Sequence, residues 1–210
     1  MTARAARCGN DPRGEFGLPP SVGQLAIPVP GTKNTVLHIG VDPVEHQRRQ
    51  QAGLGAILNW AVLDLLMDLP AGEPVPVNVI ERDLLRRLPA GAAEVTATHI
   101  TRLAVRPCRV HRAVVAGTAT RRNLDRVGRF APFCARVLLI PKPPRRSDFL
   151  SEADFWGIGV TLEHSDGSHE VLVPEQPWVF RRHTMIGWRF VEEAYGQAVA
   201  RLASDPEATQ

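Results

Sequence analysis

The spacing of apolar residues changes along the chain, and this change limits the folds open to it. Between Leu54 and Leu69 apolar residues recur at steps of three and four, the pattern of a helix that buries one face. From Glu94 the period changes to two, which is typical of strands, and a second helical pattern covers Thr184 to Ala203. We therefore expect an α+β or α/β fold, with a mixed β-sheet flanked by an N-terminal and a C-terminal helix.

The N-terminal helix is expected over residues 43–69, because a strong start signal precedes its apolar stripe. Asp42 can cap the helix, Pro43 suits its first position and Glu45 can close a capping box. Pro70 ends the pattern. A stripe of this kind is typical of core packing, so we assign it to the core.

Further elements follow from local patterns of alternation, capping and turn residues. We expect strands over 35–41, 95–105, 110–118 and 135–141, helices beginning at 78 and over 120–130 and 147–155, and a β-hairpin over 158–173.

The tip of this hairpin brings two histidines and two glutamates close to one turn. Asp166-Gly167 predicts a two-residue type I′ turn. That turn would pair His164 with His169 and Glu163 with Glu170. Because neighbours along a strand point to opposite faces, the imidazoles and the carboxylates would lie on different sides of the ribbon. We therefore favour a solvated hairpin over a zinc or acid–base site.

Length and composition fit a single folded unit with tails. The 210 residues are 44% hydrophobic and 22% charged, which excludes a fully disordered or collagen-like chain. Residues 1–33 hold five prolines and five glycines with little periodicity, so we expect a flexible arm there. We place one globular domain at residues 34–204 and a disordered tail at 205–210.

Cysteine usage and the lack of a long apolar run indicate the compartment. The cysteines Cys8, Cys108 and Cys134 are odd in number and widely spaced, which excludes a disulfide scaffold and favours a reducing compartment. The longest apolar run, residues 52–67, is too broken to span a bilayer, and no targeting segment stands out. We expect a cytoplasmic protein with no membrane partner.

Positive charge is concentrated in the middle of the chain. Residues 95–147 hold twelve basic side chains and a single acid, Asp125, for a local net charge of +11, whereas the rest of the chain sums to −8. Of the 25 basic residues 23 are arginine, whose planar fork suits bidentate contacts with phosphate. One interpretation is a surface for nucleic acid or for an acidic protein partner. The other is compositional bias, with the arginines solvated or paired to acids elsewhere in the chain.

Motif searches give no catalytic assignment. The sequence lacks a G-x-S-x-G nucleophile elbow, a phosphate-binding P-loop and a G-x-G-x-x-G fingerprint. Cys108 and Cys134 lie near arginines, which can activate a thiol, but their apolar surroundings favour buried structural thiols. From the sequence we assign no catalytic residue, no metal site and no cofactor.

The order of elements in residues 110–162 resembles the later part of a PD-(D/E)XK, or restriction-endonuclease-like, core. That order is strand, helix, strand, short helix and strand. In this family the first of these strands carries an acid-x-Lys pair that binds metal and activates water. Here the matching stretch, residues 114–118, reads Val-Val-Ala-Gly-Thr, and Arg102 and Arg106 stand where an aspartate is expected. The resemblance implies a nucleic-acid-binding or scaffolding protein that has lost nuclease chemistry.

Our working hypothesis is a non-catalytic nucleic-acid-binding protein that uses the arginine-rich segment 95–147. One alternative is a protein-interaction subunit that binds an acidic protein partner. A second is a nuclease-like enzyme whose residues converge only in the fold. On the helix over 120–130, arginines at steps of four and three form one stripe. The expected phosphate contacts, which we predict to form one exposed basic patch, are Arg121, Arg122, Arg126, Arg129, Arg145 and Arg146.

Overall fold

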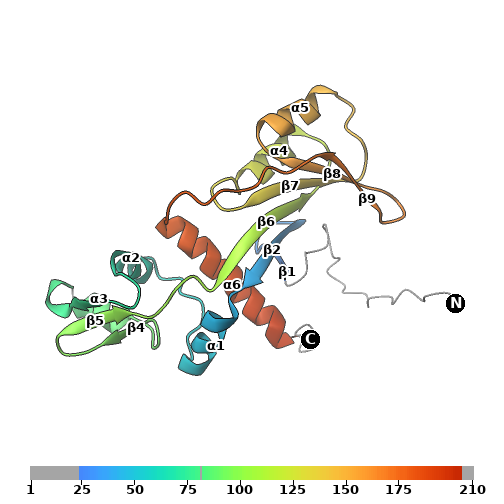
Figure 1. Cartoon of the computed structure of the whole chain (residues 1–210). Helices are drawn as coiled ribbons and strands as arrows, with labels where there is room; N and C mark the ends of the chain where they lie inside the picture. The colour runs from blue at the N-terminus through green and yellow to red at the C-terminus, as the bar shows by residue number, and fades with distance from the viewer. Residues whose placement is uncertain (1–23, 81, 205–210) are drawn as a thin grey trace.

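A six-stranded mixed sheet forms the centre of the protein in this computed structural model, which describes residues 24–80 and 82–204 (Figure 1). The strands are β1 (Leu25–Pro28), β2 (Thr35–Val41), β6 (Cys108–Ala116), β7 (Ala135–Ile140), β8 (Gly159–Glu163) and β9 (His169–Val173). They lie in the order β1-β2-β6-β7-β8-β9, with β6, β7 and β8 parallel and the other neighbours antiparallel. The mixed sheet and the α+β class are confirmed.

Three helices cover one face of this sheet. They are α4 (Arg121–Gly128), α5 (Asp148–Phe155) and α6 (Met185–Ser204). On β6, Ala113 packs in the cluster formed with α6, and Val115 packs in the cluster formed with α4 and α5. Because side chains two positions apart on a strand share a face, all three helices lie on the same side. None of the helices within the described ranges has both the length and the apolar character needed to cross a bilayer.

The segment between β9 and α6 crosses the opposite face of the sheet. Gly159 of β8 lies directly under it, and a Cβ at this position would come within 3.0 Å of the Glu175 backbone. The Glu175 carboxylate also forms an ion pair with Arg112 of β6 at 2.8 Å. These contacts position the chain that leads into α6.

A smaller lobe is inserted between β2 and β6. It comprises α1 (Pro43–Ala52), α2 (Trp60–Asp68), β3 (Pro74–Pro76), the 3₁₀ turn η1 (Val77–Val79), α3 (Arg82–Arg87), β4 (Ala93–Val95) and β5 (His99–Arg102). Its strands form a separate antiparallel sheet in the order β3-β5-β4. Leu63 and Leu66 of α2 pack with Trp188, which docks the lobe on the first half of α6. Figure 1 shows α2, α3 and this sheet at the opposite end of the molecule from α4 and α5.

A buried ion cluster joins α1 of the lobe to α6. The Arg49 side chain is fully buried, and its two terminal nitrogens donate to the two carboxylate oxygens of Glu192, both at 2.8 Å. Its Nε donates to Glu45 at 2.7 Å, and its remaining N–H groups donate to the carbonyls of Gly55 and Val105. All five N–H donors of Arg49 are therefore satisfied.

The helix expected over residues 43–69 is wrong as a single helix, because the chain forms α1 and α2 instead. Gly53 adopts a left-handed φ of 65°, and its N–H donates to carbonyls of the last turn of α1, which ends that helix. Asn59 then caps α2. Asp42 caps α1 as expected, whereas Glu45 forms ion pairs with arginines instead of closing a capping box.

The flexible arm predicted over residues 1–33 extends too far. Residues 25–28 form the edge strand β1, which pairs with β2 and buries Ile27 completely. Pro28 ends this strand, and proline is tolerated there because one side of an edge strand needs no donor. Residues 1–23 of the predicted arm and the tail predicted at 205–210 lie outside the described residues.

Two strand predictions also need correction. The strand expected over 95–105 is instead β4 and β5, because the Thr96 hydroxyl accepts from the His99 N–H and turns the chain. The hairpin of β8 and β9 is present, but Glu163 pairs with His169, one residue away from the predicted register. A type I′ turn needs two residues with positive φ, and only Gly167 has one in this turn.

Candidate phosphate-binding site

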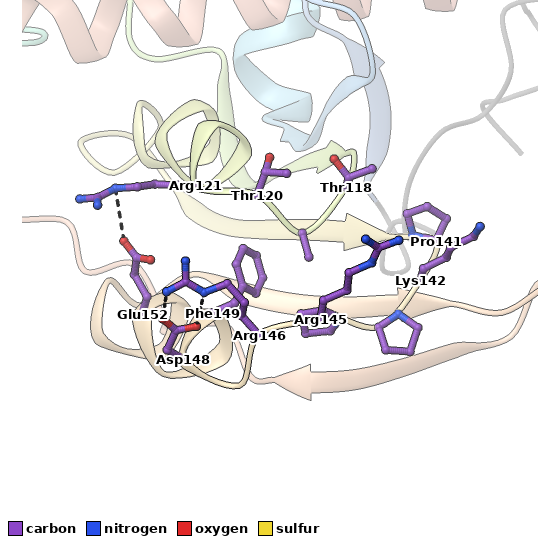
Figure 2. Close-up of a pocket in the computed structure, with 13 residues that line it drawn as sticks. Thr118, Thr120, Arg121, Pro141, Lys142, Arg145, Arg146, Asp148, Phe149 and Glu152 are labelled. Carbon is purple, nitrogen blue, oxygen red and sulfur yellow. Dashed lines mark hydrogen bonds and ion pairs between the residues drawn. The ribbon is translucent and has the colours of Figure 1, made fainter.

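The parallel strands β6 and β7 end side by side, and a pocket opens beyond their carboxyl ends (Figure 2). The pocket has a volume of about 1080 Å³. Its walls are the loops that follow the two strands and the first turns of α4 and α5. The pocket therefore lies at the carboxyl-end edge of the parallel part of the sheet. We call this pocket the strand-end pocket.

α4 begins at the strand-end pocket with positive side chains, although helix N-termini usually carry acidic ones. The first turn carries Arg121 and Arg122 and no acid, and the side chain of Thr120 makes no capping hydrogen bond. A helix N-terminus has unpaired N–H groups and a partial positive charge, so it favours anions and disfavours cations. α4 therefore adds positive potential to the pocket, which the exposed ion pair between Arg121 and Glu152 offsets in part.

α5 also begins at this pocket, but an acid neutralises its N-terminus. Asp148 is the first residue of α5 and forms an ion pair with Arg146. The hydrogen bond from Arg146 is the main reason that the pKa of Asp148 lies below its ordinary value. Of the two helix starts, only that of α4 lacks a compensating acid in its first turn.

Positive side chains outnumber acids on the pocket wall. The basic residues are Arg121, Lys142, Arg145 and Arg146, and the acids are Asp148 and Glu152. Arg121 forms an exposed ion pair with Glu152 at 3.6 Å. Within the described ranges, neither Lys142 nor Arg145 forms an ion pair with a carboxylate. Figure 2 shows Arg145 extending from its loop toward the turn that carries Thr118 and Thr120.

The remaining predicted arginines lie on the outer side of α4. Leu124 and Val127 are the buried positions of the helix, and Arg122, Arg126 and Arg129 project from the side opposite them. Arg126 donates to the Lys33 carbonyl at 2.8 Å and to the Asn123 side chain at 3.3 Å. Arg122 and Arg129 are exposed, and neither has an ion-pair partner in the described part of the chain. We call these three residues the α4 stripe.

The structure thus divides the six predicted contact residues into two adjoining groups. Arg121, Arg145 and Arg146 line the strand-end pocket, and the other three form the α4 stripe on the helix that starts there. In the described ranges, no ion pair joins any of the six to an acid of α1. Lys142 and the hydroxyls of Thr118 and Thr120 were missed. These residues follow β6 and β7 directly, and the prediction of β6 and β7 as parallel neighbours would have indicated that they lie close together.

Other arginines of the segment 95–147 serve different purposes. Arg112 forms its ion pair with Glu175, and Arg136 donates to the Trp156 carbonyl at 2.7 Å. Arg102 donates to the Leu66 carbonyl of α2 at 2.7 Å. The local charge of +11 is therefore spread over several surfaces, and only part of it faces the strand-end pocket.

The cysteines and histidines that the structure describes offer little nucleophilic or metal chemistry. Burial raises the pKa of both Cys108 and Cys134 to about 12, so their thiols stay protonated at neutral pH. At the hairpin, His164 lies 3.2 Å from Glu170. No group of three or more histidine, cysteine, aspartate or glutamate side chains within residues 24–80 and 82–204 is arranged to hold a metal ion.

Comparisons with protein-family models, with curated proteins and with solved structures find no match to this chain. The functional argument therefore depends on the geometry of the site.

Proposed function

We propose that the protein binds nucleic acid without cleaving it, by holding backbone phosphates at the strand-end pocket and along the α4 stripe. The observation that carries this proposal is the start of α4, where Arg121 and the uncapped Thr120 line the pocket, Arg122 follows on the outer side of the helix, and the first turn has no acid. An anion placed there would gain from the helix dipole, from backbone N–H groups and from guanidinium donors at the same time.

Phosphate fits this arrangement better than the carboxylates of an acidic protein. Arg121, Lys142, Arg145 and Arg146 approach the pocket from two loops, and the hydroxyls of Thr118 and Thr120 add donors between them. A phosphate has several acceptor oxygens and can use donors from several directions. The α4 stripe extends the charge beyond the pocket, as a polyanion with repeated phosphates requires.

The order of elements supports the same proposal by analogy. β6, α4, β7, α5 and β8 follow one another as in the later part of a PD-(D/E)XK core. The matching stretch of β6 and its following turn has no acid, and Val114 and Val115 are buried among apolar side chains. We therefore propose a nucleic-acid-binding relative of that architecture without its metal chemistry. The proposed location is the cytoplasm, because Cys108 and Cys134 are free thiols.

The test is a fluorescence-anisotropy titration with duplex DNA at several salt concentrations. If about six phosphates are contacted, the logarithm of the affinity falls against the logarithm of the salt concentration with a slope of about −5. Arg122→Ala and Arg145→Ala each reduce the steepness of this slope by about 1, with similar losses on unrelated sequences.

Arg86→Ala is the matched control, because Arg86 is an exposed arginine of α3, at the other end of the molecule. It leaves the slope unchanged. Absence of binding at low salt would overturn the proposal and favour an acidic protein partner. Magnesium-dependent cleavage of the DNA would instead favour the nuclease-like alternative.

A further inference from the structure

A second pocket opens near the start of β6, between α6 and the segment that crosses from β9. Its volume is about 380 Å³, at the small end of the range for ligand sites. Four aromatic rings and three arginines contribute to its wall: Phe133, Trp178, Phe180, Phe190, Arg106, Arg109 and Arg182. No acidic side chain lines it among the described residues. We call it the aromatic pocket.

The rings of the aromatic pocket form two pairs. Phe133 and Phe190 stack with centroids 4.4 Å apart and planes inclined by 20°. Trp178 and Phe180 meet edge to face at 5.9 Å, and Phe180 is 43% exposed. These rings offer flat apolar surface that the fold itself does not cover, which is the surface on which a planar heterocycle stacks.

Among the described residues, no ion pair neutralises the arginines of the aromatic pocket. The Arg106 guanidinium lies 5.3 Å from the centroid of the Phe180 ring, and its buried Nε has no hydrogen-bond partner. Burial lowers the pKa of Arg106. The pKa of His183 is lowered mainly by burial and, to a smaller extent, by the charges of Arg106 and Arg102. An anionic ligand would supply an acceptor for this buried Nε.

α4 connects the aromatic pocket to the strand-end pocket. The helix begins at the strand-end pocket, and four residues after its last residue the chain reaches Pro132 and Phe133 on the wall of the aromatic pocket. The α4 stripe, from Arg122 to Arg129, covers about 10 Å of the distance, because a helix rises about 1.5 Å per residue. Thr118, just past the end of β6, lines the strand-end pocket, and Cys108, at the start of β6, lines the aromatic pocket. The two pockets are therefore separated by about the length of this strand, roughly 26 Å.

We propose that the aromatic pocket takes an unpaired base of a nucleic-acid strand whose phosphates continue along the α4 stripe to the strand-end pocket. This inference rests on the proposed function and adds to it a contact that only single-stranded nucleic acid can make. In a duplex the faces of the bases are already stacked, whereas a single strand can turn one base outward onto protein rings. The arginines beside the rings suit the phosphate of that nucleotide.

The experiment compares a single-stranded oligonucleotide with a duplex of the same sequence by fluorescence anisotropy. Phe180→Ala weakens single-strand binding by at least about fivefold, the lower end of what one stacked base contributes, and leaves duplex binding unchanged. The control is Phe155→Ala, because Phe155 is a 78% exposed phenylalanine on α5 that lines neither pocket. It changes neither affinity. Arg106→Gln, which retains most of the side chain, also weakens single-strand binding selectively.

Three outcomes would overturn the inference, and they separate it from the proposed function. Equal effects of Phe180→Ala and Phe155→Ala on single strands would remove the base-binding role, while salt-dependent duplex binding would leave the proposed function intact. Loss of all oligonucleotide binding at low salt would remove both. Binding of free adenosine monophosphate with no oligonucleotide binding would also contradict both, and would identify a site for a free nucleotide.

Discussion

Two Arg-Arg pairs on two helices of this protein have opposite environments. Arg48-Arg49 lies in the second half of α1, where positive charge is favoured by the helix dipole, and both side chains bind Glu45. Arg121-Arg122 opens α4, where positive charge is disfavoured, and only Arg121 has an acid partner, at 3.6 Å. The first pair stabilises the fold. The second carries a cost that an anionic ligand can offset, which is why we assign function to α4.

The two arginine pairs have the same charge but differ in their exposure to solvent. Arg49 is fully buried with every donor satisfied, and Glu192 accepts two further hydrogen bonds, from the Ile57 N–H and the Trp188 Nε1. Nothing comparable restrains Arg122, which is exposed. A mutation at the first site should therefore change stability, and a mutation at the second should change binding.

The largest expected effect is that of Arg49→Met. This change removes the cation and leaves the buried carboxylate of Glu192 without its two-pronged partner, while Glu45 keeps Arg48, so we expect the free energy of unfolding to fall by about 3–5 kcal/mol. Urea denaturation followed by circular dichroism measures it. Arg86→Met is the control, since its ion pair with Asp83 is exposed and contributes little. Equal stability of the two variants would contradict a structural role for the cluster.

An intermediate effect, dependent on pH, is expected for Glu45→Gln. Burial acts to raise the pKa of Glu45, but hydrogen bonds and charge from Arg48 and Arg49 outweigh burial and hold it below 4.5. The unfolded chain therefore binds this proton more readily than the folded protein, so the stabilisation is complete above pH 4.5 and is lost as the pH falls below it.

The measurement for Glu45 is the free energy of unfolding of both proteins across this pH range. We expect Glu45→Gln to cost about 1.5–3 kcal/mol at pH 7, the usual contribution of hydrogen bonds to a charged group. The difference between the two proteins should narrow below pH 4.5. A difference that stays constant down to pH 3 would mean that the pKa of Glu45 is the same in the folded and the unfolded protein, which would contradict the lowered pKa.

The smallest effect on stability, and the one of opposite sign, is expected for Arg122→Glu. An acid in the first turn of α4 complements the helix dipole, so the variant should be more stable by about 0.3–1 kcal/mol. The same change should weaken DNA binding, because it places a negative charge in the α4 stripe. A variant that loses stability and keeps its affinity would reverse the roles that we assign to the two pairs.

Local sequence patterns were sufficient for α4 but not for the pocket at its start. Leu124 and Val127 define the buried side of the helix, so the α4 stripe follows from spacing alone. Lys142 joins the site only because β7 lies parallel to β6, which brings the loops after both strands together. The order of strands in the sheet determines that these loops are neighbours, and the sequence of neither loop indicates it.

The buried cluster could not be predicted for a similar reason. Arg49 and Glu192 are 143 positions apart, and each resembles an ordinary solvent-facing residue of an amphipathic helix in its own segment. The aromatic pocket was missed because Trp178 and Phe180 follow the hairpin with no regular period. In the sequence they are distant from the arginine-rich segment, while the fold places them beside Arg106 and Arg109.

The insertion of the lobe between β2 and β6 has a consequence for how the chain folds. β2 and β6 are neighbours in the sheet, but every residue from α1 to β5 separates them in sequence, and closing a long loop costs entropy before any strand contact forms. The lobe brings its own ends together, since the Asp42 N–H donates to the Pro107 carbonyl at 2.9 Å. If the lobe folds early, it therefore holds β2 beside β6 before the sheet forms. The refolding rate of the six-stranded sheet would then depend on residues of the lobe that do not contact the sheet.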